Sequence, residues 1–323
     1  MSSKTPPKII LGTHTIGDST KASVTTFDSE EDVQALLDAF YNQGYTHLDT
    51  AHDYSLNAPG TSEERLGRAV AASRFTIDTK VHSGHPGDHL PSNIELSVSK
   101  SLKALNTSAV ETMFLHVPDR HTPFEDTARA MNDAHQQGKF KNFGLSNYAA
   151  AEVKRFIEIC EEKGYNKPSI YQGHYNALVR GGEKELFPLL REHRMAFYAY
   201  SPAAGGFFSG HAGNSSRWKG DNDIAKLYSS SYSKAPVQAS LATIQNLADK
   251  YGINGHEVAL RWTVFHSMLD GKQGDGVIFG VSKIEQLHKT LAAIESGPLP
   301  VEIADAVTAI YAAVEGSEPP YHL

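Results

Sequence analysis

The sequence alternates eight times between a short β-prone run and a longer segment with apolar residues at helical spacing. The β-prone runs cover residues 7–13, 46–50, 75–80, 110–116, 141–146, 169–172, 196–201 and 276–280. The helical segments cover residues 29–44, 62–73, 90–106, 124–138, 150–164, 183–194, 237–252, 255–268 and 282–296. Strict alternation predicts right-handed crossovers and a parallel sheet, and eight units within 323 residues favour a closed barrel.

An open, doubly wound sheet is the main alternative architecture. Such a sheet binds dinucleotides through a G-x-G-x-x-G fingerprint after its first strand, but Gly12 and Gly17 stand too far apart for it. We therefore predict an α/β protein, a single-domain (β/α)8 TIM barrel over residues 1–323. The prediction includes a long loop at about residues 205–236 and a C-terminal helix and tail at about residues 301–323.

Residues typical of helix ends support this division of the chain. Ser29 and Ser62 are each followed by Glu, which predicts that they begin helices. Gly44, Gly138 and Gly164 are predicted to end them.

The charge pattern points to small-molecule chemistry. The formal net charge is -7 with no long charged block, which disfavours binding to nucleic acid or to a membrane surface. No apolar stretch approaches membrane-spanning length. The one cysteine, Cys160, falls in an amphipathic helical pattern and is predicted to be a structural thiol. We expect a cytoplasmic monomer or homodimer.

Four chemically active side chains stand at the ends of predicted strands, where a barrel assembles its chemistry. They are Asp49, Tyr54, Lys80 and His116. Taken singly, each has a structural explanation as a turn acid, a surface residue or a core histidine.

Together they form a set that can deliver a proton. Tyrosine, with a pKa of about 10, is a poor acid–base group at neutral pH unless a cation stabilises its phenolate. Lys80 could do so, Asp49 could keep that ammonium charged, and His116 could hydrogen-bond a substrate oxygen. With no evident nucleophile or metal-ligand set, the group is suited to protonating an oxygen that gains charge, as in carbonyl reduction.

The remaining strand ends are suited to a nicotinamide cofactor. Ser146, Asn147 and Gln172 could bind its carboxamide, and the ring of Tyr200 could stack on the nicotinamide. The small residues of 201–206 could approach a pyrophosphate, and Ser282 opens a helix whose N-terminus could hold a phosphate. Ordinary βα turns are the alternative for both segments.

These motifs, taken in order, resemble the aldo-keto reductases over nearly the whole chain. The match runs from "IILGTHTIG" through "HLDTAHDY", "FLHVPD", "GLSNY", "YQGHYN", "YAYSPAAGG" and "ALRW" to "VIFGVSKIEQLHKTL". It is most similar to the aflatoxin-aldehyde (succinic semialdehyde) reductase branch. His174 departs from this pattern, because an apolar residue is expected there.

The resemblance implies NADPH-dependent reduction of aldehydes, and of ketones as a second carbonyl class. Tyr54 would be the proton donor, Asp49 and Lys80 its tuning pair, and His116 the orienting residue. The implied cofactor-binding residues are Ser146, Asn147, Gln172, Tyr200, Ser201, Pro202, Gly205, Gly206, Arg217, Gly280, Ser282 and Gln286. The strand-eight segment lacks an arginine for the 2′-phosphate of NADPH, and Lys283 could substitute for it.

Other hypotheses remain open at this point. His82, His85 and His89 are close in the sequence, but their irregular spacing favours pocket lining or solvent exposure over a metal site. A nucleotide-sensing regulatory or partner-binding subunit with vestigial reductase activity is the main functional alternative. A phosphate-binding barrel isomerase is weaker, because Asp49 is the sole evident strand-end carboxylate base.

Overall fold

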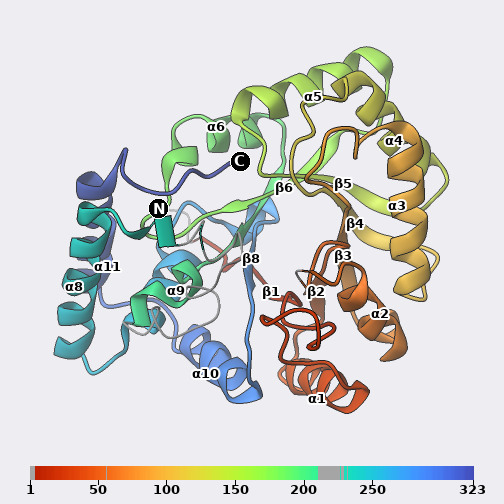
Figure 1. Ribbon diagram of the computed structural model, residues 1–323. Helices are drawn as coiled ribbons and strands as arrows, with labels where there is room; N and C mark the ends of the chain where they lie inside the picture. The colour runs from red at the N-terminus through yellow and green to blue at the C-terminus, as the bar shows by residue number, and fades with distance from the viewer. Residues whose placement is uncertain (1–3, 56, 210–225, 227–228, 231) are drawn as a thin grey trace.

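The computed structural model describes residues 4–55, 57–209, 226, 229–230 and 232–323. Within this part of the chain, eight parallel strands close into a barrel in chain order, with β1 hydrogen-bonded to both β2 and β8 (Figure 1). The strands are β1 (Lys8–Gly12), β2 (His47–Asp49), β3 (Thr76–Val81), β4 (Val110–Leu115), β5 (Phe140–Ser146), β6 (Pro168–His174), β7 (Ala196–Tyr200) and β8 (Gly276–Phe279). The predicted (β/α)8 barrel is confirmed, and every β-prone run overlaps a strand.

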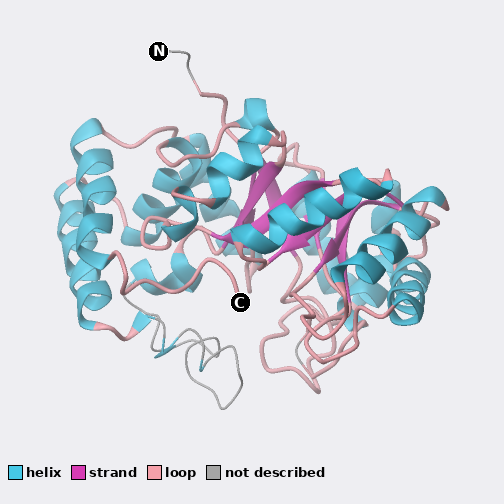
Figure 2. Cartoon of the chain, turned by 90° about the horizontal axis from the view of Figure 1, so that it is seen from above, coloured by secondary structure: helices cyan, strands magenta, loops and turns pink. Residues whose placement is uncertain are grey.

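Helices surround the strands (Figure 2). The helices are α1 (Glu30–Tyr41), α2 (Thr61–Arg68), α3 (Pro91–Ala104), α4 (Phe124–Gln136), α5 (Ala150–Lys163), α6 (Leu186–Glu192), α8 (Ala235–Lys250), α9 (Gly255–Phe265), α10 (Ile284–Glu295) and α11 (Val301–Val314). A short 3₁₀ helix, η3 (Ala204–Ser209), follows β7. Residues 210–225 of the predicted long loop lie outside the described residues.

The apolar core has two parts because side chains alternate between the two faces of each strand. The larger part fills the space between the strands and the helices, and Trp262 is among its largest buried side chains. The smaller part lies inside the barrel and consists of Ile10, Phe114, Ile170, Ala196, Tyr198 and Ile278. The inner cluster fills the barrel as a packed core beneath the polar groups at the carboxyl ends of the strands.

The two predicted helix-start serines have different roles. Ser29 caps α1 as predicted, because its side chain accepts a hydrogen bond from the Asp32 amide at 3.1 Å. The prediction for Ser62 is wrong, since Gly60 precedes the first residue of α2. Ser62 is fully buried and its hydroxyl donates to the Thr13 carbonyl at 3.1 Å, which ties α2 to the end of β1.

Gly144 in β5 leaves room for a ring inside the barrel. It pairs with Phe114 of β4, and a Cβ at Gly144 would lie 2.2 Å from the Phe114 Cδ1. Gly144→Ala should therefore lower the free energy of unfolding by about 1–3 kcal/mol through overpacking. Denaturant unfolding measures this loss. The control is Gly181→Ala, where the nearest atom lies at 3.5 Å; an equal loss in both variants would contradict the steric explanation.

Candidate active site at the carboxyl end of the barrel

A buried ion pair lies at the centre of the candidate site. Asp49 ends β2 and Lys80 stands near the end of β3, and both side chains are fully buried. The Lys80 Nζ lies 2.7 and 2.8 Å from the two Asp49 carboxylate oxygens and also donates to the Thr50 carbonyl at 2.8 Å. The ammonium is therefore held by one carboxylate and one backbone carbonyl.

Tyr54 completes a three-residue network with this pair. Its hydroxyl accepts a hydrogen bond from Lys80 Nζ at 3.0 Å and donates one to Asp49 Oδ2 at 2.8 Å. Burial lowers the pKa of Lys80, while the charge and hydrogen bonds of Asp49 act in the opposite direction without cancelling it. The phenol thus contacts both a cation with a depressed pKa and an anion, and this arrangement can take up or release a proton at Tyr54.

His116 follows β4 and faces the Tyr54 ring. The two ring centroids are 5.9 Å apart in an edge-to-face arrangement, and 21% of the His116 side chain is exposed. The His116 Nδ1 lies 3.5 Å from Asp53 Oδ2. The structure therefore brings the four predicted catalytic side chains together; their roles in the reaction stay a prediction.

Three of the predicted carboxamide and stacking residues form a hydrogen-bonded row. The Asn147 amide donates to Ser146 Oγ at 3.1 Å and to the His116 carbonyl at 2.9 Å. The Tyr200 hydroxyl donates to Asn147 Oδ1 at 2.8 Å. This row places polar side chains from β5 and β7 beside His116.

Gln172 makes a contact that the sequence did not predict. Its amide donates to Asp49 Oδ1 at 2.8 Å, across 123 residues of chain. Gln172 is 2% exposed, so this bond forms away from bulk water. It gives the Asp49 carboxylate another donor besides Lys80 and Tyr54.

The predicted phosphate-binding segments follow β7 and β8. Ser201 and Pro202 lead into η3, where Gly205 and Gly206 have φ values of 61° and 90°. A Cβ at Gly206 would meet no atom of the described residues within 4 Å. Arg217, the other predicted pyrophosphate contact, lies outside the described residues.

At the start of α10, the side chain of Gln286 occupies the hydrogen-bond donors of Ser282 that are predicted to bind a phosphate. The Ser282 amide and hydroxyl donate to Gln286 Oε1 at 2.8 and 3.0 Å, and Gly280 beside them is exposed. These donors face a side-chain oxygen, which is the kind of group that a phosphate oxygen can replace.

His174, the residue that departs from the expected pattern, packs against the predicted stacking residue. Its ring lies 5.3 Å from the Tyr200 ring with an interplanar angle of 11°. Its Nε2 lies 2.9 Å from the Tyr232 hydroxyl and 3.4 Å from the Asn176 amide nitrogen, which can only donate. Nε2 is therefore an acceptor, and His174 is a neutral ring. Burial lowers its pKa to about 4.

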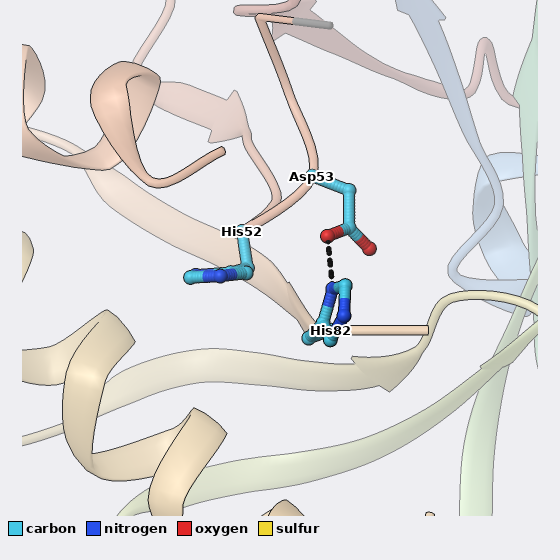
Figure 3. Close-up of side chains that lie close together, drawn as sticks. All are labelled: His52, Asp53 and His82. Carbon is cyan, nitrogen blue, oxygen red and sulfur yellow. Dashed lines mark hydrogen bonds and ion pairs between the residues drawn. The ribbon is translucent and has the colours of Figure 1, made fainter. Parts of the chain in front are cut away.

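The three histidines of the loop after β3 do not gather at one point. His89 is buried and its Nε2 lies 2.8 Å from Ser83 Oγ, whereas His82 Nδ1 lies 2.5 Å from Asp53 Oδ1 (Figure 3). Two triads place candidate ligand atoms within 4.8 Å of one another: His52 with Asp53 and His82, and His82 with His85 and Asp88. Because His82 and Asp53 already contact each other directly, we assign no metal to the loop.

A cavity of about 430 Å³ opens at the other end of the barrel, where the strands begin. Lys8, His47 and Ala196 are among its lining residues, and they are the first residues of β1, β2 and β7. Because Tyr54 and Lys80 belong to the opposite end, this cavity is distinct from the candidate site. In TIM barrels the end where the strands begin usually serves stability rather than chemistry.

Comparison with known proteins agrees with the fold. The family model described as "Aldo/keto reductase family" matches residues 8–312. An aldo-keto reductase of Pseudocercospora fijiensis is 37% identical, covering 88% of this chain and 99% of the relative. Human "Aldo-keto reductase family 7 member A3" is 37% identical over 94% of this chain and 93% of the relative. Human "Aflatoxin B1 aldehyde reductase member 2" is 37% identical over 95% of this chain and 87% of the relative.

A barrel with polar groups at its carboxyl end defines the broad class of TIM-barrel enzymes. The chain belongs to the aldo/keto reductase family, which makes it an oxidoreductase of carbonyl groups in a family that uses NAD(P)H. Across the described residues, none of the helices has both the length and the apolar character needed to cross a membrane.

The buried neutral state of His174 predicts a pH dependence of stability. Its pKa of about 4 lies below the unfolded value of 6.5, so the unfolded chain binds more protons between these pH values. Stability is therefore lost as the pH falls through this window, at up to about 1.4 kcal/mol per pH unit for each such group. His174→Gln should reduce that slope in chemical unfolding measured from pH 7 to 4.5.

The control for this experiment is His85→Gln, since 79% of the His85 side chain is exposed. Part of the slope should persist in His174→Gln, because burial also lowers the pKa of His89 to about 4. An unchanged slope in His174→Gln would contradict the neutral buried state.

Proposed function

We propose that this protein is an NADPH-dependent reductase of aldehydes, with ketones as a second substrate class. Hydride passes from the nicotinamide to the carbonyl carbon while Tyr54 protonates the carbonyl oxygen. The contact of Lys80 Nζ with both the Tyr54 hydroxyl and the Asp49 carboxylate carries this proposal. Such a contact stabilises a phenolate after proton transfer, which is what a tyrosine acid requires at neutral pH.

The cofactor is proposed to lie across the carboxyl ends of β5 to β8. Ser146, Asn147 and Gln172 bind the carboxamide, and Tyr200 stacks on the nicotinamide with His174 behind it. The glycines of η3 and the start of α10 take the phosphates. NADPH is the proposed form because Lys283, exposed at the cap of α10, can pair with the 2′-phosphate.

The proposed substrate class follows from chemistry and from similarity. A protonating phenol with a neighbouring imidazole suits an aldehyde oxygen that gains charge as hydride arrives. Among the similar proteins, three human relatives carry the names of an aldo-keto reductase or an aflatoxin B1 aldehyde reductase. We extend to this chain only the aldehyde group common to such substrates.

Tyr54→Phe tests the proton donor. Because phenylalanine keeps the ring but lacks the hydroxyl, turnover of a reactive aldehyde should fall at least about 100-fold while NADPH binding changes by less than about twofold. NADPH oxidation followed by absorbance gives turnover, and calorimetric titration gives binding. Tyr41→Phe on α1, where 41% of the residue is exposed, is the matched control. Full turnover in Tyr54→Phe would refute the assignment.

The regulatory alternative makes a different prediction for the unmodified protein. A nucleotide-sensing subunit would bind NADPH tightly yet oxidise it very slowly with every member of an aldehyde panel. The fully buried Lys80–Asp49 pair in contact with Tyr54 favours the enzyme, because a cofactor sensor has no need for a proton donor.

Lys283→Ala tests the choice of cofactor. Removing the ammonium should raise the KM for NADPH about five- to tenfold, the value of one charge-assisted contact, and leave the KM for NADH unchanged. Lys289→Ala is the control, because Lys289 is an exposed lysine of the same helix. Equal changes in the KM for NADPH and for NADH would show that Lys283 does not bind the 2′-phosphate.

A further inference from the structure

Asp53, the residue before Tyr54, lies between two histidines. Its Oδ1 is 2.5 Å from His82 Nδ1, and its Oδ2 is 3.5 Å from His116 Nδ1 (Figure 3 shows the His82 side). The Ser83 amide donates to Oδ2 at 3.0 Å, which fixes the carboxylate. Among the described residues, Asp53 is the acid within ion-pair distance of His116.

The carboxylate of Asp53 is ionised at neutral pH. Burial raises its pKa, but the contacts with His116 and His82 together lower it by more than burial raises it. The pKa therefore falls from 3.8 to about 2. A full negative charge therefore faces Nδ1 of His116 throughout the pH range in which a reductase works.

That charge affects which nitrogen of His116 carries a proton. A carboxylate oxygen facing Nδ1 favours a proton on that nitrogen. If the ring were neutral, its Nε2 would then have no hydrogen and could only accept a hydrogen bond. A carbonyl oxygen that gains negative charge needs a donor instead. His116 can supply that donor from Nε2 only when both of its nitrogens are protonated.

We propose that Asp53 is a positioning residue that keeps His116 doubly protonated, so that Nε2–H donates to the carbonyl oxygen while Asp53 holds Nδ1–H. The inference rests on the proposed function, because it assigns His116 to the substrate oxygen. Tyr54 still supplies the proton that the product retains, and His116 stabilises the charge that develops before that transfer.

Other ionisable groups surround the pair and have to be considered in its pH dependence. His82 shares the Asp53 charge, and its Nε2 lies 3.7 Å from Asp88. The other ionisable groups near Asp53, His116 or His82 are Tyr54, His52, His89 and Asp119. Because Asp53 is the acid that faces His116 Nδ1, its removal should have a larger effect on His116 than the loss of Asp88.

Asp53→Asn is the test, since asparagine keeps the shape and an acceptor oxygen but loses the charge. We expect kcat near neutral pH to fall at least about tenfold with the KM for NADPH within about twofold. The alkaline fall of kcat should begin at a lower pH than in the wild type, because the charge of Asp53 no longer faces the doubly protonated ring. Wild-type kcat and pH profile in Asp53→Asn would overturn the proposal.

Asp88→Asn is the matched control. It removes a carboxylate that faces the same histidine, His82, and leaves the contact between Asp53 and His116 in place. Its kcat and pH profile should match the wild type. A midpoint of thermal unfolding within a few degrees of the wild type shows that Asp53→Asn has folded.

A second measurement tests the pair without turnover. In ¹⁵N-histidine-labelled protein bound to NADP⁺, with His116 assigned by comparison with His116→Gln, the His116 nitrogens should both carry protons in the wild type at neutral pH. In Asp53→Asn this form should be lost at a lower pH. An unprotonated Nδ1 in the wild type, or identical titrations in both proteins, would overturn the role of Asp53.

The two measurements separate the inference from the proposed function. If the wild type binds NADPH but reduces no carbonyl, the proposed function fails, and the nitrogen spectra still decide whether Asp53 keeps His116 doubly protonated. If the wild type is active and the spectra of wild type and Asp53→Asn coincide, the reductase stands and the inference on Asp53 falls.

Discussion

The candidate site depends on the ion pair between Lys80 and Asp49, which is entirely removed from water. Taking two charges out of water costs several kcal/mol for each ion, so such a pair is tolerated only when further hydrogen bonds satisfy both groups. Asp49 receives donors from Tyr54 and Gln172 in addition to Lys80, and Lys80 also donates to the Thr50 carbonyl. Apolar side chains of similar size at these positions would often stabilise a fold as well as a buried ion pair does. The presence of this pair therefore argues for a chemical role.

The closed barrel determines where this pair forms. Asp49 is in register with Asp78 of β3, and Lys80 stands two residues further along the same strand. Residues two apart in a strand share a face, so Lys80 points into the barrel like Asp78 and reaches the end of β2 with its long side chain. Gln172 of β6 reaches the same carboxylate from the other side. Parallel strands that ended at different levels would leave these charges unpaired.

Much of this arrangement could be predicted from the sequence, because it depends on local patterns. The alternation of β-prone and helical segments gives the strands, and the last residues of those strands give Asp49 and Lys80. The partner of Gln172 could not be predicted, because it is set by closure of the barrel between segments 123 residues apart. Ser62 fits a helix cap in sequence, yet it packs into the gap beside Thr13. No local pattern distinguishes these two uses of a serine.

The loop after β2 affects both proposed donors to the carbonyl oxygen, Tyr54 and His116. Tyr54 belongs to this loop, and Asp53, the residue before it, faces His116. Its backbone is tied to the neighbouring strand, since the His52 amide donates to the Lys80 carbonyl at 3.1 Å. Tyr54 turns inward to the buried ion pair, while Asp53 turns toward His116 and His82. A shift of this loop would therefore move two groups at the same time: the Tyr54 phenol and the Asp53 carboxylate that faces His116. The position of the loop, more than any one side chain, then decides whether both donors reach the same oxygen.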